Sequence, residues 1–424
     1  MNRRNISRLL VTVFWGLSVL DVSANGFGLA SQDAFATARG EAFAATADNP
    51  SAIFYNPAGI TQLAGNNLRA GLYGIYLDPS YSPPSGRYDS GNTYHSSDHL
   101  AAVPQLFYTY TAKDWPVSFG LGVYAPFGGR MDWPYGASFN TVSTQGKLAY
   151  LTANPVIAVK LAPSLSLAGG VMVNYVNMDL EQVISYPTRN PNFFRFTGYG
   201  WSVGYNLGLR WQPIDQISIG ATFRSSAPVN LNGHTEFQYP PTTPYTSLPA
   251  QADFTFPLTA VVGISYRPTP KWNLEFDANY TDWSSFGNST INQKGSAFGF
   301  PQNIPVNLDW QASWMLEFGV TRYFDNGWHV SAGYVYNQTS VPDAYYTPLA
   351  ADLDRHFLSV GAGYKGKRFD CDIAYQFGYG PAHTVTGSTP PIVFSNFGNP
   401  ITSPADGKYD FISQAVLVTV GMHF

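Results

Sequence analysis

The chain has little charge, a single cysteine and no long apolar run in its main part. Asp, Glu, Lys and Arg make up 12% of its 424 residues, whereas soluble domains average about 25%. The net charge of −4 argues against a nucleic acid as partner. Cys371 has no second cysteine with which to pair, so no intrachain disulfide is expected. After residue 24 no stretch approaches the roughly 18 apolar residues of a transmembrane helix, so we expect none.

The amino terminus has the pattern of a secretory signal peptide. Three arginines in the first eight residues precede an apolar run over residues 9–20, and small residues follow at 22–24. The apolar run is too short to cross a bilayer as a helix. We therefore expect residues 1–24 to be removed and the mature chain to begin at Asn25.

The chain is rich in aromatic residues, at 16%, and in segments where apolar and polar residues alternate. From Ile412 to Phe424 one parity is almost entirely apolar, while the other is small or polar apart from Leu417. Successive side chains of a strand face opposite sides of a sheet. An amphipathic edge strand of a soluble sandwich would give the same pattern, but a strand this long is typical of a transmembrane barrel. A closed barrel satisfies every backbone group in lipid without helices.

The same alternation recurs along the chain and predicts fourteen strands. They span about 67–77, 99–111, 116–125, 147–161, 165–179, 199–212, 216–226, 253–267, 271–283, 310–323, 328–338, 355–365, 367–379 and 411–424. Short turns alternate strictly with long connections, as in outer-membrane barrels with short periplasmic turns and long external loops. Eight of the ten tryptophans, all but Trp15 and Trp133, lie near predicted strand ends, which favours interfacial aromatic girdles. The sequence therefore predicts an all-β membrane protein, a fourteen-stranded antiparallel barrel over residues 67–424, with Cys371 facing lipid.

Residues 25–66 do not follow the strand pattern. They are rich in alanine and glycine and carry scattered charges, which indicates short helices and turns. They could form a periplasmic extension. We expect instead an amino-terminal hatch that plugs the barrel, because fourteen strands enclose a lumen otherwise open to water.

Several motifs resemble the FadL-type outer-membrane transporters of long-chain fatty acids and other hydrophobic molecules. They include Gly26-Phe27-Gly28, Asn56-Pro57-Ala58, Ala125-Pro126-Phe127-Gly128 and the run from Tyr280 to Phe286. The resemblance extends over the whole mature chain in the expected order. It implies a fourteen-stranded barrel with an amino-terminal hatch in the Gram-negative outer membrane, surrounded by lipid and lipopolysaccharide.

The resemblance also implies where a hydrophobic substrate first binds. In the family, external loops form a groove, and here the predicted loops 180–198 and 227–252 are rich in aromatic residues. Packing of the loops against each other explains these aromatics equally well. The residues that we expect to bind substrate are Phe193, Phe194, Phe196, Phe237 and Tyr239.

Release is implied to occur sideways, through an inward kink in the third strand. Two glycines in that strand weaken its ladder and permit a kink, although they could equally leave space for the hatch. The expected gating residues are Asn25, Gly26, Phe27, Asn56, Pro57, Ala58, Phe119, Gly120 and Gly122.

No catalytic constellation is present, so we expect no enzyme. The seven histidines are dispersed without metal-ligand spacing, and neither a metal nor another cofactor is expected. We expect a monomer whose carboxyl-terminal Phe424 is recognised by the barrel assembly machinery.

The substrate stays open between fatty acids and neutral aromatic hydrocarbons. Asn177 and residues 309–311 offer no base where fatty acid carriers have basic residues, so a carboxylate would depend on Arg224 or Arg210. A general hydrophilic porin is the competing function. It would need a wide, wet lumen, which the hatch and the aromatic loops disfavour.

Overall fold

The computed structural model describes residues 26–97, 99–184, 192–238, 244–296, 300–350, 352–392 and 402–424. The predicted signal peptide, Asn25 and Tyr239 lie outside these residues.

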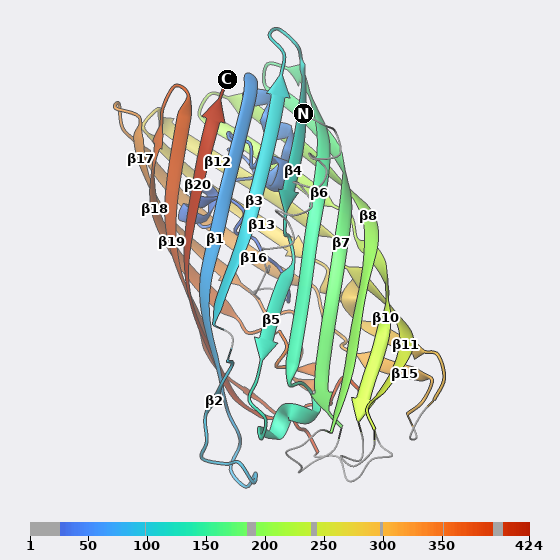
Figure 1. The fold of residues 1–424 in the computed structure, drawn as a ribbon. Coiled ribbons are helices and arrows are strands. Elements are labelled where there is room, and N and C mark those ends of the chain that lie inside the picture. The colour runs from blue at the N-terminus through green and yellow to red at the C-terminus, as the bar shows by residue number, and fades with distance from the viewer. Residues whose placement is uncertain are drawn as a thin grey trace, which may run out of the picture.

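The strands form one closed antiparallel barrel (Figure 1). Closure is made by β1 (Gly65–Ser82) and β20 (Gly407–His423), which pair from Asn67↔His423 to Ser82↔Lys408. The other segments are β2 (Tyr94–His95), β3 (Leu100–Thr111), β4 (Val117–Tyr124), β5 (Gly128–Asp132), β6 (Gln145–Ala162), β7 (Leu165–Val183), β8 (Phe193–Ile214), β9 (Ile217–Arg224), β10 (Ala227–Gln238), β11 (Thr246–Phe256), β12 (Thr259–Thr269), β13 (Trp272–Thr281), β14 (Asn288–Gln293), β15 (Asn303–Asn307), β16 (Ser313–Tyr323), β17 (Trp328–Asn337), β18 (Arg355–Lys365) and β19 (Phe369–Val385).

These segments make fourteen wall strands, which confirms the sequence prediction. The short β2 lies in an external connection, and five wall strands are each interrupted once. The interrupted pairs are β4/β5, β9/β10, β11/β12, β13/β14 and β15/β16.

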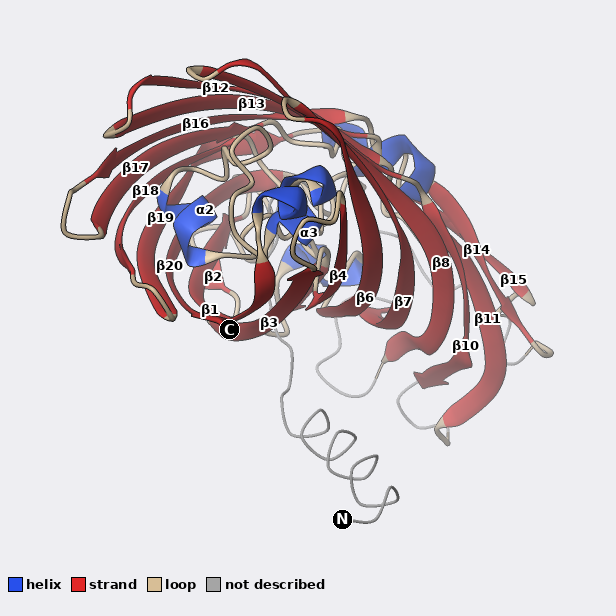
Figure 2. Ribbon diagram, turned by 90° about the horizontal axis from the view of Figure 1, so that it is seen from above, coloured by secondary structure: helices blue, strands red, loops and turns tan. Residues whose placement is uncertain are grey.

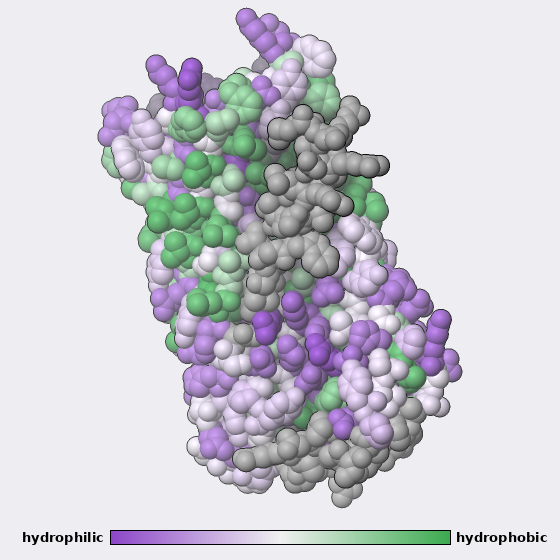
Figure 3. Space-filling model, in the orientation of Figure 1, coloured by the Kyte–Doolittle hydropathy of each residue, from purple (hydrophilic) through white to green (hydrophobic). Residues whose placement is uncertain are grey.

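Outward and inward side chains follow the predicted parity. In β20, Val416, Val418 and Val420 are exposed, while Leu417 on the opposite parity is fully buried inside. Cys371 is exposed on the outer face of β19. Figure 3 shows apolar residues gathered over the upper part of the wall, with polar residues toward the end that carries β2.

Six of the eight tryptophans predicted to form the girdles point outward, and two do not. The exposed six are Trp115, Trp201, Trp211, Trp272, Trp314 and Trp328. Trp283 and Trp310 are 0% and 2% exposed and lie inside the barrel. The reason is that both lie at strand interruptions, where the chain leaves the regular alternation.

Several of the predicted loops contain strands. The ranges 227–252 and 284–309 hold β10, β14 and β15 and part of β11, which extend the wall beyond its apolar zone. In this part of the wall the apolar side chains face the interior and the polar ones face outward, the reverse of the lipid-facing part. Val229 and Leu231 are buried, while Asn230 between them is exposed. A wall surrounded by water has no apolar outer face, so a search for lipid-facing strands misses it.

The amino-terminal segment forms short helices inside the ring of strands (Figure 2). They are α2 (Ala34–Ala38), α3 (Ala52–Tyr55) and the 3-10 helix η1 (Pro57–Gln62). Three more 3-10 turns lie in connections between strands: η2 (Ser138–Thr141), η3 (Trp283–Phe286) and η4 (Asp343–Tyr345). None of the helices in the described part of the chain is long and apolar enough to cross a membrane.

One buried ionic cluster joins this segment to the wall. Asp33 caps α2 by accepting from the N–H groups of Phe35 and Ala36. The same carboxylate binds the guanidinium of Arg69 on β1, which also pairs with Asp370 at 2.9 Å and Asp372 at 2.6 Å on β19. Asp33 and Arg69 are 0% and 2% exposed, so little water screens their attraction.

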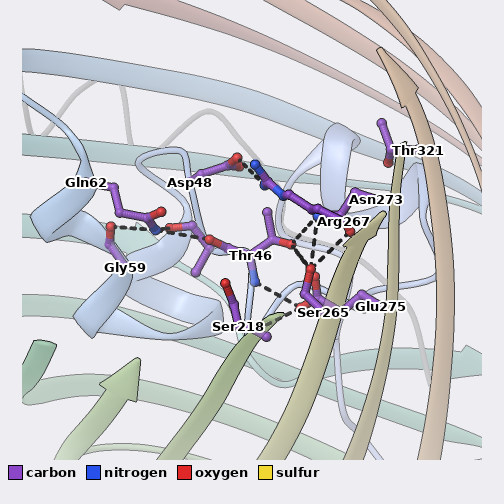
Figure 4. Close-up of polar contacts among 12 residues, drawn as sticks. Thr46, Asp48, Gly59, Gln62, Ser218, Ser265, Arg267, Asn273, Glu275 and Thr321 are labelled. Atoms are coloured by element: carbon purple, nitrogen blue, oxygen red, sulfur yellow. Dashed lines mark hydrogen bonds and ion pairs between the residues drawn. The ribbon is translucent and has the colours of Figure 1, made fainter. Parts of the chain in front are cut away.

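A second polar cluster lies on the wall formed by β12 and β13. The carboxylate of Glu275 accepts from the N–H of Ala45 at 2.7 Å and binds Arg39 at 3.0 Å. Figure 4 shows Thr46 and Asn273 beside Glu275, with the partly exposed Asp48–Arg267 ion pair close by. The segment is thus held on two sides of the lumen.

Candidate functional site

Six aromatic side chains pack together inside the barrel at the level of the strand interruptions. This aromatic cluster consists of Phe27, Phe127, Phe256, Trp283, Phe286 and Trp310. The ring centroids of Phe27 and Trp310 are 5.3 Å apart, as are those of Phe127 and Phe256, and Trp283 lies 5.4 Å from Trp310. All but Phe27 lie in an interruption or at its edge. The interruptions therefore turn wall residues into lumen residues.

An apolar pocket lies on one side of the aromatic cluster, among the strand ends that carry the long connections. We call it the outer pocket. Its walls include Phe27, Met178, Phe194, Phe254, Leu308 and Trp310.

A larger cavity lies on the other side and reaches the amino-terminal segment. We call it the inner cavity. Its apolar walls include Tyr73, Met172, Val261, Met315, Val335 and Phe357. Phe27 lines the outer pocket, whereas Gly28 and Leu29 line the inner cavity. The first described residues of the chain thus lie between the two spaces.

These residues are hydrogen-bonded to the interruption in the third strand. The N–H of Leu29 donates to the carbonyl of Pro126 at 2.8 Å, and the N–H of Gly128 donates to that of Phe27 at 2.9 Å. Gly28 and Phe127 face each other as an antiparallel bridge. The position of residues 27–29 is therefore coupled to the backbone of residues 126–128.

The barrel ladder is incomplete at this place. The pairing of β3 with β4 ends at Leu106↔Val123, whereas the pairing of β3 with β1 continues to Leu100. Within the described residues β5 pairs with β6 and not with β3. Residues 100–105 therefore have a ladder partner on one side only.

The structure places the predicted gating glycines in a regular part of the wall. Gly120 pairs with Thr109 of β3 and Val156 of β6, and the interruption lies further along, at residues 125–127. A Cβ added at Gly120 or Gly122 would lie 2.9 Å from the Ile53 side chain of α3. The glycines leave room for the amino-terminal segment. Phe119 beside them points outward, 41% exposed.

The predicted Asn56-Pro57-Ala58 turn packs against β8. The Asn56 amide donates to the carbonyls of Ala44 at 2.7 Å and Leu209 at 2.9 Å, and its oxygen accepts from Ala58 N–H at 3.1 Å. Gly208 of β8 lies directly beneath this turn. The turn therefore fixes the segment to the wall on β8.

Of the five aromatics expected to bind substrate, Phe194 lines a pocket. Phe194, Phe196 and Phe237 are all fully buried in β8 and β10, and the rings of Phe237 and Phe300 lie 4.5 Å apart. Phe193 is half-buried, with its ring centroid 6.2 Å from that of Tyr245. These side chains belong to the packed wall formed by β8 and β10 and not to an exposed loop.

Sequence reasoning missed Trp283, Phe286 and Trp310 as pocket residues. Trp283 and Phe286 belong to the motif from Tyr280 to Phe286, which was the available signal. Trp310 carried no comparable signal.

The inner cavity also receives a buried carboxylate from the amino-terminal segment. Glu41 accepts hydrogen bonds from Ser31 Oγ at 2.8 Å and from Tyr55 Oη at 2.7 Å. Burial raises the pKa of Glu41 to about 7. In the part of the chain that the structure describes, no group of three or more His, Cys, Asp or Glu residues is arranged to hold a metal ion.

Solved structures share this fold. That of a Pseudomonas aeruginosa FadL homologue superposes with a TM-score of 0.79 at 19% identity, covering 94% of this chain and all of that one (100%). The Ralstonia pickettii toluene transporter TbuX gives a TM-score of 0.68 at 16% identity, covering 94% and 99%.

Sequence comparison gives the family. The long-chain fatty acid transport protein of Escherichia coli K12 is 23% identical over 428 residues, covering 87% of this chain and 90% of that protein. The family model described as outer membrane protein transport protein (OMPP1/FadL/TodX) matches residues 18–413. The chain therefore belongs to the OMPP1/FadL/TodX family of outer membrane transport proteins, and its barrel lies in the outer membrane of a Gram-negative bacterium.

Proposed function

We propose that this protein is a channel, without catalytic activity, that takes up hydrophobic molecules across the outer membrane. The substrate enters the outer pocket, passes the aromatic cluster into the inner cavity and leaves sideways between β3 and the third strand. Residues 25–66 act as the hatch that closes the barrel axis. The observation that carries this proposal is the bonding of residues 27–29 to the interrupted strand, between the two spaces.

The physical basis is the transfer of apolar surface. The lipopolysaccharide leaflet is polar and resists apolar solutes, whereas burial in an apolar pocket is worth about 25 cal/mol per Å². Release must then avoid water, because the same free energy would be lost there. An opening in the wall delivers the solute directly to lipid. A shift of residues 27–29 would break their two backbone bonds at the interruption and open the way.

The relatives support the class of substrate. The Escherichia coli relative is a long-chain fatty acid transport protein, and the Ralstonia pickettii structure is that of a toluene transporter. Their substrates share apolarity and differ in head group. We propose further that the protein works as a monomer and that Phe424 is recognised by the barrel assembly machinery.

A reversible disulfide tests the proposal. Gly28 and Phe127 form a non-hydrogen-bonded antiparallel pair, since the bonds run between their neighbours. Cα atoms in such pairs lie about 4.5 Å apart, within the range of a disulfide. The variant Gly28→Cys/Phe127→Cys, made with Cys371→Ser, should lose uptake of radiolabelled oleate or toluene when oxidised and regain it on reduction.

The single-cysteine variants are the matched controls, and oxidation should leave their uptake unchanged. Retention of uptake by the fully oxidised double variant would refute movement of the amino terminus as a step. If no hydrophobic compound is taken up even by the unmodified protein, the proposed function itself is wrong.

A further inference from the structure

An open apolar groove lies on the outer face of the barrel wall. It crosses β12, β13, β16 and β17, which pair in this order and lie side by side on the far side of the ring from β3 (Figure 2). Because the barrel lies in the outer membrane, this face meets lipid. The outward-facing residues of the groove are Ile264, Tyr266, Leu274, Phe276, Phe318, Val320, Ala332 and Tyr334.

The groove is built from two successive cross-strand rows. One row consists of Tyr266, Leu274, Val320 and Ala332, and the next of Ile264, Phe276, Phe318 and Tyr334. The ring centroids of Phe276 and Phe318 are 4.8 Å apart, and those of Phe318 and Tyr334 are 6.2 Å apart. Large rings thus stand beside the small side chain of Ala332, and the difference in height leaves space for a hydrocarbon chain.

A guanidinium lies at the end of the groove toward the short turns. Arg322 follows Val320 by two residues on β16 and faces the same side, about 7 Å further along the strand. Its guanidinium carbon is 4.9 Å from the ring centroid of Trp272, its cross-strand partner, and 5.8 Å from that of Phe324. Both rings are exposed, and aromatic residues at strand ends mark the level of the lipid head groups. Arg322 therefore lies at head-group level.

The guanidinium of Arg322 has no anionic partner among the described residues. It contacts the two rings and makes no side-chain hydrogen bond or ion pair within this part of the chain. The carboxylate of Asp325 in the adjoining turn binds Lys271 at 2.6 Å. A guanidinium carries five N–H donors in a fork that matches the oxygens of a phosphate. The donors of Arg322 are thus open to an anion from the lipid.

We propose that the groove binds one phospholipid of the periplasmic leaflet, with an acyl chain along Val320 and Phe318 and the phosphate on Arg322. An apolar groove alone would suit any neighbour in the membrane, but the cation at its head-group end favours an anionic one. The short turns are the periplasmic ends of an outer-membrane barrel, and lipopolysaccharide occupies the opposite leaflet. The inference does not depend on the proposed uptake, because the groove lies outside the lumen.

Native mass spectrometry of the purified, detergent-solubilised full chain tests the site. The probes are dioleoylphosphatidylglycerol and dioleoylglycerol, which have the same acyl chains and differ in the phosphate head group. We expect the first molecule of phosphatidylglycerol to bind at least roughly fivefold more tightly than the following ones and than dioleoylglycerol. This is the scale of one basic residue at anionic head groups, about 1 kcal/mol.

Two variants separate the head group from the groove. Arg322→Gln should weaken the first binding of phosphatidylglycerol roughly fivefold and leave the binding of dioleoylglycerol unchanged. Ala332→Phe should weaken the binding of both probes, because the larger ring fills the groove. Comparing each probe between two proteins cancels its partition into micelles.

Arg368→Gln and Ala362→Phe are the matched controls. Arg368 is exposed in the short turn between β18 and β19, and Ala362 lies on β18 opposite Val330. Neither residue lines the groove. Both variants should bind the two probes as the unmodified protein does, and heat-modifiable migration in electrophoresis checks that all four variants are folded.

Three results would overturn the proposal. Binding of successive phosphatidylglycerol molecules with equal affinity would mean an ordinary lipid annulus without a site. A loss of affinity in Arg368→Gln as large as in Arg322→Gln would attribute the effect to the general charge of the rim. Tighter binding of lipopolysaccharide than of phosphatidylglycerol at Arg322, or a dimer that displaces the lipid, would assign the groove to another occupant.

Discussion

Replacing Asp33 by asparagine should release the amino-terminal segment from the wall. Asp33→Asn keeps an oxygen to cap α2 but places an amide N–H₂ where Oδ2 now accepts from Arg69. Arg69 retains Asp370 and Asp372, so its charge is not left unpaired. The variant therefore loses the ion pair that joins the segment to the barrel and little else.

The size of the effect follows from burial. A hydrogen bond between charged groups contributes about 1.5–3 kcal/mol, and Asp33 and Arg69 are almost completely buried. A loss of about 2–3 kcal/mol in docking free energy raises the undocked population roughly 30- to 150-fold. Because the segment occupies the lumen, undocking should appear as open events in single-channel conductance across planar bilayers.

Asp48→Asn is the control within the same segment. Asp48 pairs with Arg267 at 3.2 Å, but their side chains are 26% and 38% exposed. Such an exposed pair is worth about 0.5 kcal/mol, which changes the open fraction roughly twofold. If Asp33→Asn opens no more often than Asp48→Asn, the buried cluster does not hold the segment. A large, steady conductance in the unmodified protein would favour the hydrophilic porin.

Two further variants examine the segment and its fit. The pKa of Glu41 is raised from 4.5 to about 7 in the folded state, so the folded protein binds this proton more tightly than the undocked one. Docking of the segment should therefore weaken by roughly 3 kcal/mol as the pH rises from 4.5 through 7. Hydrogen exchange of residues 27–62, corrected for intrinsic rates, should show this loss, and Glu41→Gln should abolish it; an equal pH dependence in the variant would contradict the assignment. Gly120→Val should increase channel opening, because its Cβ would lie 2.9 Å from Ile53, and overpacking costs about 1–3 kcal/mol. Gly74→Val, whose Cβ would meet one carbonyl at 3.7 Å, should leave conductance unchanged, and equal behaviour of the two variants would argue against the contact.

The wall of the barrel could be predicted from the sequence because the membrane imposes a strict rule on it. Every strand that crosses lipid must present an apolar outer face, so residues such as Val416 and Val418 identify the strand and its orientation together. Outside the membrane a strand need not present an apolar outer face. There β10 buries Val229 and Leu231 and exposes Asn230, and the same search assigned its residues to a loop.

The candidate site could be predicted only in part, because it is made by departures from the strand rule. Trp283 and Trp310 were assigned to the girdles since tryptophan near a strand end usually lies at the interface. Whether such a residue turns outward or inward depends on an interruption of the strand, and the interruptions are defined by pairings between distant segments. The motif from Ala125 to Gly128 was recognised in the sequence. The kink was nevertheless predicted at glycines, because the backbone freedom of glycine can be inferred from a sequence. The bonds from Phe27 and Leu29 that mark the actual interruption join residues about a hundred positions apart and leave no local pattern.

The two anchoring clusters fit the proposal that one segment both closes the lumen and moves. Residues 33–48 are held by buried carboxylates on opposite sides of the barrel, at Arg69 and at Glu275. Residues 27–29, by contrast, are bonded to the wall through the Phe27 carbonyl and the Leu29 N–H. Breaking two such bonds costs on the order of 2 kcal/mol, less than undocking the charged clusters. Binding of an apolar molecule offsets that amount when it buries about 80 Å² more apolar surface in the displaced state than in the docked one. In the proposed mechanism the substrate displaces residues 27–29 while the rest of the segment stays in place, and the opening is in the wall and not along the axis.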